Sequence, residues 1–290
     1  MKMSEITLIG LGSMGQAIAK ALLDHNVELT VWNRTAEKSE ALVNLGARGE
    51  SDLGLAISAS PLIIICVSDY AITHALLDQS EIVPLLRGKT ILQLSTGTPG
   101  EVRKAHQWVV EQGGRYLDGS IMVYPQTVGT KAGQILVSGA EAVYRDCETY
   151  LGLLGGDVRY LGEEIGAAAA LDLAVVSRLT AITPGVIHGA LICEAEGVSL
   201  EQFAAMYPPG DRAYSLAMTI HNNDFESNIA ASVNVAIGVA TSIKRQSQEL
   251  GINSDFPDFQ LSLYKRAVAA GFQNQDTASL IKVLRADTSN

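Results

Sequence analysis

The sequence predicts an α/β domain, then a long interdomain helix, then an all-helical domain, and three observations predict this fold class. Short β-branched runs alternate with helical stretches from Ile6 to about Gly162. The first run leads into a glycine-rich turn, GLGSMG, which opens a helix as in Rossmann-type dinucleotide-binding domains. Strand patterns stop at Gly166, where helical patterns take over. We therefore expect a Rossmann-type domain over residues 1–163, and the interdomain helix with the helical domain over residues 164–290.

The first part of the chain contains seven strand patterns, which read ITLIG, ELTVW, LIIICV, TILQLS, RYLDGSIM, QILVSG and VRYL. Because most of these runs are almost continuously apolar, we expect a mostly parallel sheet that is covered on both faces. The helical patterns between them read MGQAIAKALLDH, TAEKSEALVNLG and TPGEVRKAHQWVVEQG. In the last pattern Thr98 is the predicted N-cap, Pro99 takes the first helical position, and Glu101 completes a capping box.

The second part begins with GAAAALDLAVVSRLTAITPGVIHGALICEAEG, which predicts one helix of about 30 residues. Pro184 interrupts this pattern and is expected to kink the helix or to break a hydrogen bond there. Further helical patterns lie near residues 200–206, 211–221, 228–250, 257–270 and 277–285.

Composition argues against several classes of protein. The net charge of −10 and the pI near 5.0 disfavour binding to nucleic acid or to anionic membranes. The longest aliphatic strand run, LIIICV, is too short to cross a bilayer, and we expect no signal peptide ahead of Ile6. Three scattered cysteines do not suggest disulfides, and the dispersed histidines lack the spacing of zinc ligands. We therefore expect a cytoplasmic, soluble protein with no metal, nucleic-acid or membrane partner.

The turn after the first strand carries the first candidate site. Gly10 permits the tight turn, Gly12 lets a pyrophosphate approach the backbone, and Gly15 allows the helix to pack closely on the strand. The N-terminus of the helix then faces the phosphates. The residues expected to bind a dinucleotide here are Gly10, Leu11, Gly12, Ser13, Met14 and Gly15.

The end of the second strand selects the dinucleotide. An NAD site usually has an acid there to hold the ribose hydroxyls, whereas this chain reads WNRTAEK. Arg34 offers a planar fork for a 2′-phosphate, Thr35 a hydroxyl and Lys38 a second positive charge. With Asn33, these residues predict NADPH/NADP+ as the cofactor; a solvated surface arginine is the alternative interpretation of Arg34.

An acid stands alone at the start of the long helix. The stretch from Ala167 to Val176 is apolar apart from Asp172, and helical spacing points Arg178 to roughly the opposite side. Burial of an unpaired carboxylate is costly enough that its pKa usually shifts. Asp172 is therefore either a functional group, or a polar residue exposed at a domain seam or bound to a backbone amide.

The motifs GLGSMG, VWNRT, CVSDY, LSTGTP and LDGSIMVYPQTVGT, with the long helix after VRYLG, resemble the imine reductases and reductive aminases. These enzymes belong to the β-hydroxyacid dehydrogenase superfamily. The resemblance covers nearly the whole chain, and it is weakest beyond about Ser199. It implies an NADPH-dependent oxidoreductase that reduces C=N bonds of cyclic imines to amines. It also implies a homodimer with exchanged helical domains, so that residues 164–290 serve dimerisation and substrate binding.

The wider superfamily supplies an informative contrast. Its hydroxyacid dehydrogenases have a lysine six residues after the first glycine of the long helix and an asparagine four residues further on, where this chain has Asp172 and Val176. They also have a Gly-Gly pair where this chain has Tyr124-Pro125. An anion in place of the cation suits a protonated C=N group. The resemblance thus implies that Asp172 is the proton donor or the group that stabilises the iminium.

Other candidates lie at strand ends and on the helices. Parallel sheets bind ligands at the carboxyl ends of their strands, so we expect the cofactor to contact Val67, Ser68, Ser95 and Thr96. Gln93 and Thr180 replace the Asn and Tyr typical of reductive aminases, which leaves open whether the chain catalyses reductive amination or reduces only preformed imines. The candidate substrate-pocket residues are Gln93, Tyr124, Val176 and Tyr214.

Two other functions remain alternatives. The first is a β-hydroxyacid dehydrogenase-like carbonyl or alcohol oxidoreductase, and the missing lysine and asparagine tell against it. The second is a catalytically inactive NADPH-binding sensor, and the acid on the long helix tells against it.

Overall fold

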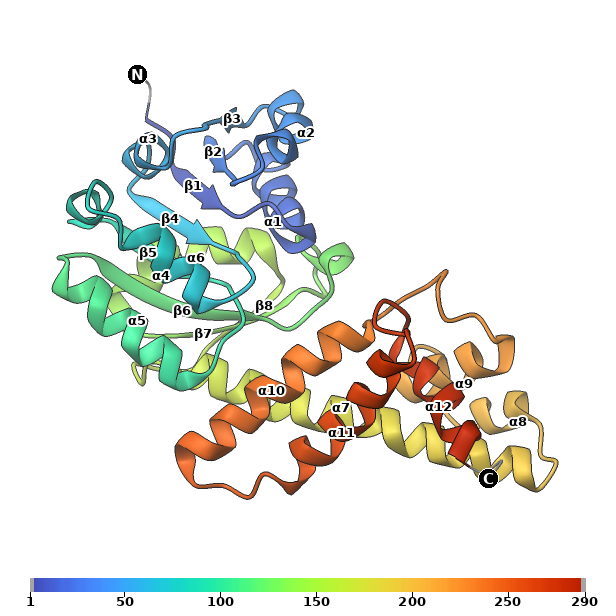
Figure 1. The fold of residues 1–290 in the computed structure, drawn as a ribbon. Helices are drawn as coiled ribbons and strands as arrows, with labels where there is room; N and C mark the ends of the chain where they lie inside the picture. Colours follow the sequence, from blue (N-terminus) through green and yellow to red (C-terminus); the bar gives the residue numbers. More distant parts are fainter. Residues whose placement is uncertain (1–2, 288–290) are drawn as a thin grey trace. The chain divides into compact units, whose positions relative to one another are not determined.

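The computed structural model describes residues 3–287 and divides the chain into two compact units, with the boundary between Asp172 and Leu173. The first unit contains an eight-stranded sheet with helices, and the second is helical (Figure 1). A helix of 29 residues begins in the first unit and continues into the second. The predicted fold class is therefore confirmed.

The sheet of the first unit is parallel at every pairing except one. Its strands are β1 (Ile6–Ile9), β2 (Leu29–Trp32), β3 (Arg48–Gly49), β4 (Leu62–Ile65), β5 (Thr90–Gln93), β6 (Arg115–Ile121), β7 (Gln134–Ser138) and β8 (Asp157–Tyr160). They lie in the order β3-β2-β1-β4-β5-β6-β7-β8, and the β6–β7 pair is antiparallel. The order changes direction between β1 and β4, where open parallel sheets bind ligands at their carboxyl edge. Strand β3 was not predicted, because two residues leave no pattern.

Helices cover both faces of this sheet. They are α1 (Ser13–Leu23), α2 (Glu40–Asn44), α3 (Leu53–Ser58), α4 (Tyr70–Leu77), α5 (Pro99–Glu111) and α6 (Glu141–Leu154). Successive strand side chains point to opposite faces, so Leu8 packs in one core with α1 and α6, whereas Ile9 packs in the other with α3, α4 and α5. This double cover explains why most of the strands are almost continuously apolar.

Local sequence signals predicted some helix boundaries correctly and others incorrectly. The capping box of α5 is present: the Thr98 hydroxyl accepts from the Glu101 amide at 3.2 Å, and the Glu101 carboxylate accepts from the Thr98 amide at 2.8 Å. The pattern TAEKSEALVNLG, expected as one helix, is split into a 3-10 turn, η1 (Ala36–Ser39), and the short α2. Two further 3-10 turns are η2 (Val83–Leu86) and η3 (Pro125–Thr127).

The second unit is built around the long helix. Its elements are the later part of α7 (Ala167–Ala195), then α8 (Leu200–Ala204), α9 (Arg212–Asn222), α10 (Val233–Leu250), α11 (Asp255–Ala269), η4 (Thr277–Ser279) and α12 (Leu280–Asp287). Their core includes Ile187, Leu216 and Tyr264. Pro184 lies inside α7 without ending it.

Helix α10 begins five residues later than the sequence predicted, and a buried carboxylate explains the difference. Asp276 accepts hydrogen bonds from the amides of Ala230 and Ala231, at 3.1 and 3.5 Å. Arg212 pairs with the same carboxylate at 3.1 Å, and Asp276 is only 1% exposed. The segment before α10 is therefore held as a loop, and Ser232 caps the helix through the Val235 amide.

Helix α7 is long and apolar enough to cross a membrane, judged by length and composition alone. The expectation of no membrane span rested on the short aliphatic run in β4 and did not take α7 into account. Within a single chain, 22% of its most apolar window is buried. Helices in the cores and interfaces of soluble proteins have the same length and composition, so this finding by itself is weak evidence for a membrane span.

Candidate active site

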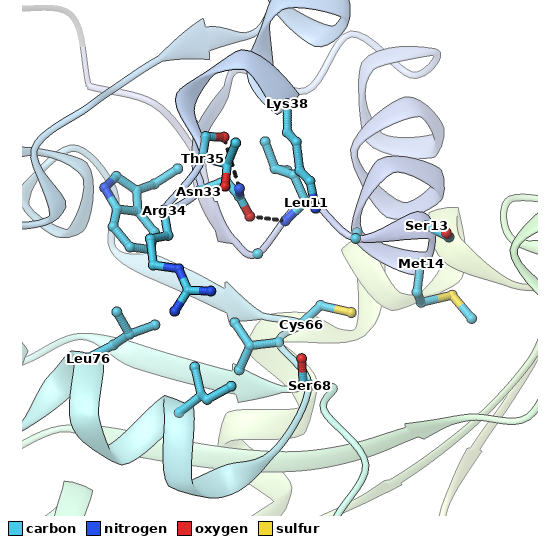
Figure 2. Close-up of a pocket in the computed structure, with 16 residues that line it drawn as sticks. Leu11, Ser13, Met14, Asn33, Arg34, Thr35, Lys38, Cys66, Ser68 and Leu76 are labelled. Atoms are coloured by element: carbon cyan, nitrogen blue, oxygen red, sulfur yellow. Dashed lines mark hydrogen bonds between the residues drawn. The ribbon is translucent and has the colours of Figure 1, made fainter. Parts of the chain in front are cut away.

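A cavity of about 360 Å³ opens at the carboxyl ends of β1, β2 and β4 in the first unit. Figure 2 shows the side chains around it, which come from the β1–α1 turn, the loop after β2, the loop after β4, and α4. We call it the dinucleotide cavity. The lining residues are Gly10, Leu11, Gly12, Ser13, Met14, Gly15, Trp32, Asn33, Arg34, Thr35, Lys38, Cys66, Val67, Ser68, Ile72 and Leu76.

The three glycines of the turn meet different constraints. Gly10 has a φ of +99°, and a Cβ there would lie 2.3 Å from the carbonyl oxygen of Cys66. A Cβ on Gly15 would lie 2.0 Å from the carbonyl oxygen of Gly10. Both positions therefore require glycine for the chain to fold in this way. A Cβ on Gly12 would meet nothing within 4 Å, so the backbone there faces open space that a pyrophosphate can occupy.

The first turn of α1 offers an anion-binding site. Gly12 is the N-cap and has no side chain to satisfy the first amides of the helix, and no acid lies in that first turn. Unsatisfied amides and the positive end of the helix dipole therefore meet the cavity. This arrangement fits a phosphate group.

The loop after β2 contains one residue that shapes the cavity, Asn33, and two that can bind a ligand, Arg34 and Lys38. The Asn33 side chain accepts from the Leu11 amide at 3.0 Å and donates to the Thr35 carbonyl at 2.9 Å (Figure 2). Asn33, expected among the cofactor ligands, therefore ties the loop to the glycine turn. Within residues 3–287, the Arg34 guanidinium and the Lys38 ammonium have no side-chain partner, and both residues are exposed beside the cavity.

A second cavity, of about 160 Å³, adjoins the first and contains Asp172. It shares Met14, Cys66 and Val67 with the dinucleotide cavity. Its remaining lining residues are Leu94, Ser95, Thr96, Ser120, Ile121 and Asp172. The Ser95 hydroxyl accepts from the Val67 amide at 2.9 Å and so joins the loops after β4 and β5. We call this space the acid cavity.

Burial raises the pKa of Asp172 from 3.8 to about 6. The carboxyl group has no hydrogen bond or ion pair with any residue in the described range, so nothing offsets the loss of water around it. Such a group changes its protonation state close to neutral pH. Among the lining residues, the neighbouring Cys66 thiol does not compete for the proton, because burial raises its pKa to about 12.

A second acid near the start of α7 is buried, and it was not among the site residues predicted from the sequence. Asp118, on β6, is 1% exposed, and it accepts a hydrogen bond from the Tyr70 hydroxyl at 3.0 Å. Burial raises its pKa to about 7, and the negative charge of Asp172 also raises it. The available signal was an acid inside the apolar strand pattern RYLDGSIM, the same kind of signal that singled out Asp172.

The four candidate substrate-pocket residues do not line either cavity. Gln93 is fully buried, and its amide donates to the Thr73 hydroxyl at 2.9 Å, beneath α4. Tyr124 is 60% exposed. Val176 and Tyr214 belong to the second unit, where both are half-buried and Tyr214 packs against the helical core. The expected cofactor residues, in contrast, all line one cavity or the other.

A parallel sheet with this strand order, a glycine turn at a helix N-terminus and a basic loop after β2 define an NADP-binding protein of the Rossmann class. Residues 5–162 match the family described as the NAD binding domain of 6-phosphogluconate dehydrogenase. Residues 164–286 match the family described as the NADPH-dependent reductive aminase-like C-terminal domain.

Whole-chain comparisons identify the family. The chain is 31% identical to an NADPH-dependent reductive aminase of Aspergillus oryzae over 290 residues, which cover 97% of each protein. An imine reductase from Myxococcus stipitatus in complex with NADP+ superposes with a TM-score of 0.68 at 32% identity, covering 97% of this chain and 99% of that one. A reductive aminase from Aspergillus terreus in complex with NADPH and ethyl levulinate superposes with a TM-score of 0.65 at 32% identity and the same coverage. The chain therefore belongs to the family of imine reductases and NADPH-dependent reductive aminases.

Proposed function

We propose that the chain is an NADPH-dependent imine reductase, which reduces the C=N bond of cyclic or other preformed imines to an amine. One observation carries this proposal: the dinucleotide cavity adjoins a cavity that holds a half-buried, unpaired carboxyl group, Asp172. A carboxyl group there suits a cationic or protonatable substrate. The family of the chain supports the same reaction.

The cavity geometry supports specific roles in cofactor binding. The amides at the start of α1, with the open backbone at Gly12, suit the pyrophosphate. Arg34, Thr35 and Lys38 suit the 2′-phosphate of NADPH, because a guanidinium forms charged, bidentate hydrogen bonds with phosphate. NADPH, when bound, supplies the hydride. The loops after β4 and β5 line the remaining space with Val67, Ser68, Ser95 and Thr96.

Asp172 donates the proton that the imine needs or stabilises the iminium. A C=N group accepts hydride readily as the protonated iminium, so the enzyme must either protonate a neutral imine or hold an iminium that is already charged. With a pKa of about 6, the Asp172 carboxyl group donates its proton at mildly acidic pH and stabilises a neighbouring cation as a carboxylate at higher pH. Positioned acids and preorganised charges both act most strongly in sites that exclude water.

We further propose that the protein is a cytoplasmic homodimer with exchanged helical halves. Leu171, Val175 and Leu179 form a stripe along α7 at spacings of four residues, and they are 41%, 36% and 41% exposed in the single chain. A continuous apolar stripe on a helix needs cover, and a second copy supplies it. In this arrangement Val176 and Tyr214 of each chain complete the substrate site of the other chain. Light scattering should show a dimer; an active, monodisperse monomer at micromolar concentration would exclude it.

The experiment that tests the proposed activity follows NADPH absorbance with a pyrroline, a cyclic imine. Consumption of NADPH that depends on the pyrroline supports the proposal. Oxidation of a hydroxyacid with NADP+ in place of that activity would identify a β-hydroxyacid dehydrogenase-like enzyme. Tight NADPH binding without turnover of either substrate would identify an NADPH-binding sensor.

A further inference from the structure

Asp118 has no role in the reaction as proposed above, yet it is the more deeply buried of the two acids near the start of α7. Its Oδ1 accepts from the Tyr70 hydroxyl at 3.0 Å, and the Tyr116 hydroxyl donates to the Tyr70 hydroxyl at 3.4 Å. In the described part of the chain, Oδ2 is fully buried and has no hydrogen-bond partner. A buried carboxyl group with one oxygen unsatisfied is costly, so a specific use is expected for it.

The first turn of α7 meets side chains from β6 and β7. Ser138 lies opposite Asp118 in the antiparallel pairing, and its hydroxyl accepts from the Ala168 amide at 3.2 Å. The next amide, that of Ala169, lies beside the Asp118 carboxyl group and favours its charged form. Asp172 follows Ala169 by three residues on the same helix. The group that meets the start of α7 therefore lies about one helical turn from the acid of the proposed reaction.

The surroundings leave few other charges to act on these two acids. The titratable groups beside Asp118 are Tyr70 from α4, Tyr116 from β6 and Asp172 from α7, and both tyrosine pKa values are raised by burial. The strands on either side contribute neutral groups, Gln93 from β5 and Ser138 from β7. From α5, the Glu101 carboxylate is bonded to the Thr98 amide.

The remaining groups around Asp172 are neutral. Ser95, Thr96 and Ser120 line the acid cavity with it, and the Cys66 thiol stays protonated. Asp172 is therefore the nearby acid whose charge raises the pKa of Asp118.

A negative charge on one carboxyl group raises the pKa of a second carboxyl group beside it. The pKa of Asp172 is about 6 and that of Asp118 about 7, so the Asp172 proton leaves first and the resulting anion delays ionisation of Asp118.

We propose that Asp118 is a positioning residue for Asp172: its buried carboxyl group, bonded to Tyr70, anchors the first turn of α7 and so sets where the Asp172 carboxyl group meets an iminium. The role toward an iminium rests on the proposed function. The coupling of the two acids does not rest on it, and it is measurable without any substrate.

The test is a titration of aspartate side chains, labelled with ¹³C at Cγ, by NMR in the full-length protein. Asp118→Asn identifies the Asp118 signal and should leave Asp172 titrating near its original pH, because Asp118 is neutral when Asp172 ionises. Asp172→Asn should lower the pKa of Asp118 below about 7, because the neighbouring negative charge is absent. Asp118 titrating at the same pH in Asp172→Asn and in the wild type would overturn the proposal.

Tyr70→Phe gives an independent test if Asp118→Asn fails to fold. It removes one hydroxyl that favours the charged form of Asp118, so the pKa of Asp118 should rise. The upper limb of the pH profile of kcat/KM for a pyrroline should then move to higher pH. Thr73→Val is the matched control: it removes another buried hydrogen bond beneath α4 but touches neither acid, and it should keep the wild-type profile. Equal shifts of the pH profile in Tyr70→Phe and Thr73→Val would show that Asp118 has only a structural role. Coupled titration without turnover of any imine would contradict the proposed function and leave the coupling of the two acids intact.

Discussion

Replacement of Asp172 by asparagine should stabilise the protein, and only at a pH where the carboxyl group is ionised. Burial raises its pKa from 3.8 to about 6, and each pH unit corresponds to 1.36 kcal/mol. The difference is about 3 kcal/mol, an upper bound because the side chain keeps some water. We expect roughly 1–3 kcal/mol of stabilisation in Asp172→Asn at pH 7.5.

The sign of this effect follows from proton linkage. The folded state binds the Asp172 proton more tightly than the unfolded state, so the contribution of Asp172 to stability is fully present below the unfolded pKa of 3.8 and is lost as the pH rises through about 6. The asparagine variant lacks this loss. Its advantage should therefore vanish near pH 4 and reach its plateau above pH 7.

Urea unfolding of the two proteins at equal concentration, from pH 4 to pH 8, measures this difference. Equal concentration matters because a dimer gains stability by mass action. Leu173→Ala, one residue further along α7 and buried, is a control that should destabilise the protein equally at every pH. A pH-independent difference for Asp172→Asn, or a loss of stability at pH 7.5, would refute the assignment of Asp172 as a buried, unpaired acid.

Two further predictions concern charged groups elsewhere. Arg34→Ala should raise the KM for NADPH about tenfold to a hundredfold, as expected for loss of roughly 1.5–3 kcal/mol of charged hydrogen bonding, and leave that for NADH nearly unchanged; equal losses with both cofactors would assign Arg34 to folding or to the shared part of the cofactor. Arg212→Ala should destabilise the protein by about 3–5 kcal/mol in urea unfolding, because it leaves the buried Asp276 carboxylate without its cation. A change below about 1 kcal/mol would show that the amides of Ala230 and Ala231 suffice to stabilise that carboxylate.

The sequence predicted those parts of the fold that depend on local patterns. Apolar runs mark β1, β4 and β5 because both faces of the sheet are buried, and Thr98, Pro99 and Glu101 mark the start of α5 because capping acts between near neighbours. The glycine turn and the basic loop after β2 also lie next to each other in the structure. Their positions follow from the order of the first two strands.

Features that depend on contacts between distant residues could not be predicted in this way. The late start of α10 depends on Asp276, more than 40 residues away in the chain. Gln93 was a candidate for the substrate pocket, yet it faces Thr73 beneath α4, because the alternation of side chains along β5 points it into the core. The hydrogen bond between Tyr70 and Asp118 spans 48 positions, so only the fold reveals it.

The measurement that tests the central claim most directly is the turnover of a neutral cyclic imine by Asp172→Asn. Asparagine keeps the shape of the side chain but neither donates an acidic proton nor carries a charge. A positioned general acid contributes about a hundredfold to ten-thousandfold in rate, and a substrate that arrives already protonated reduces this loss. We predict that kcat/KM for a pyrroline at pH 7 falls at least about tenfold while NADPH binding is unchanged. Full turnover in Asp172→Asn would show that the carboxyl group is structural and would contradict the proposed mechanism.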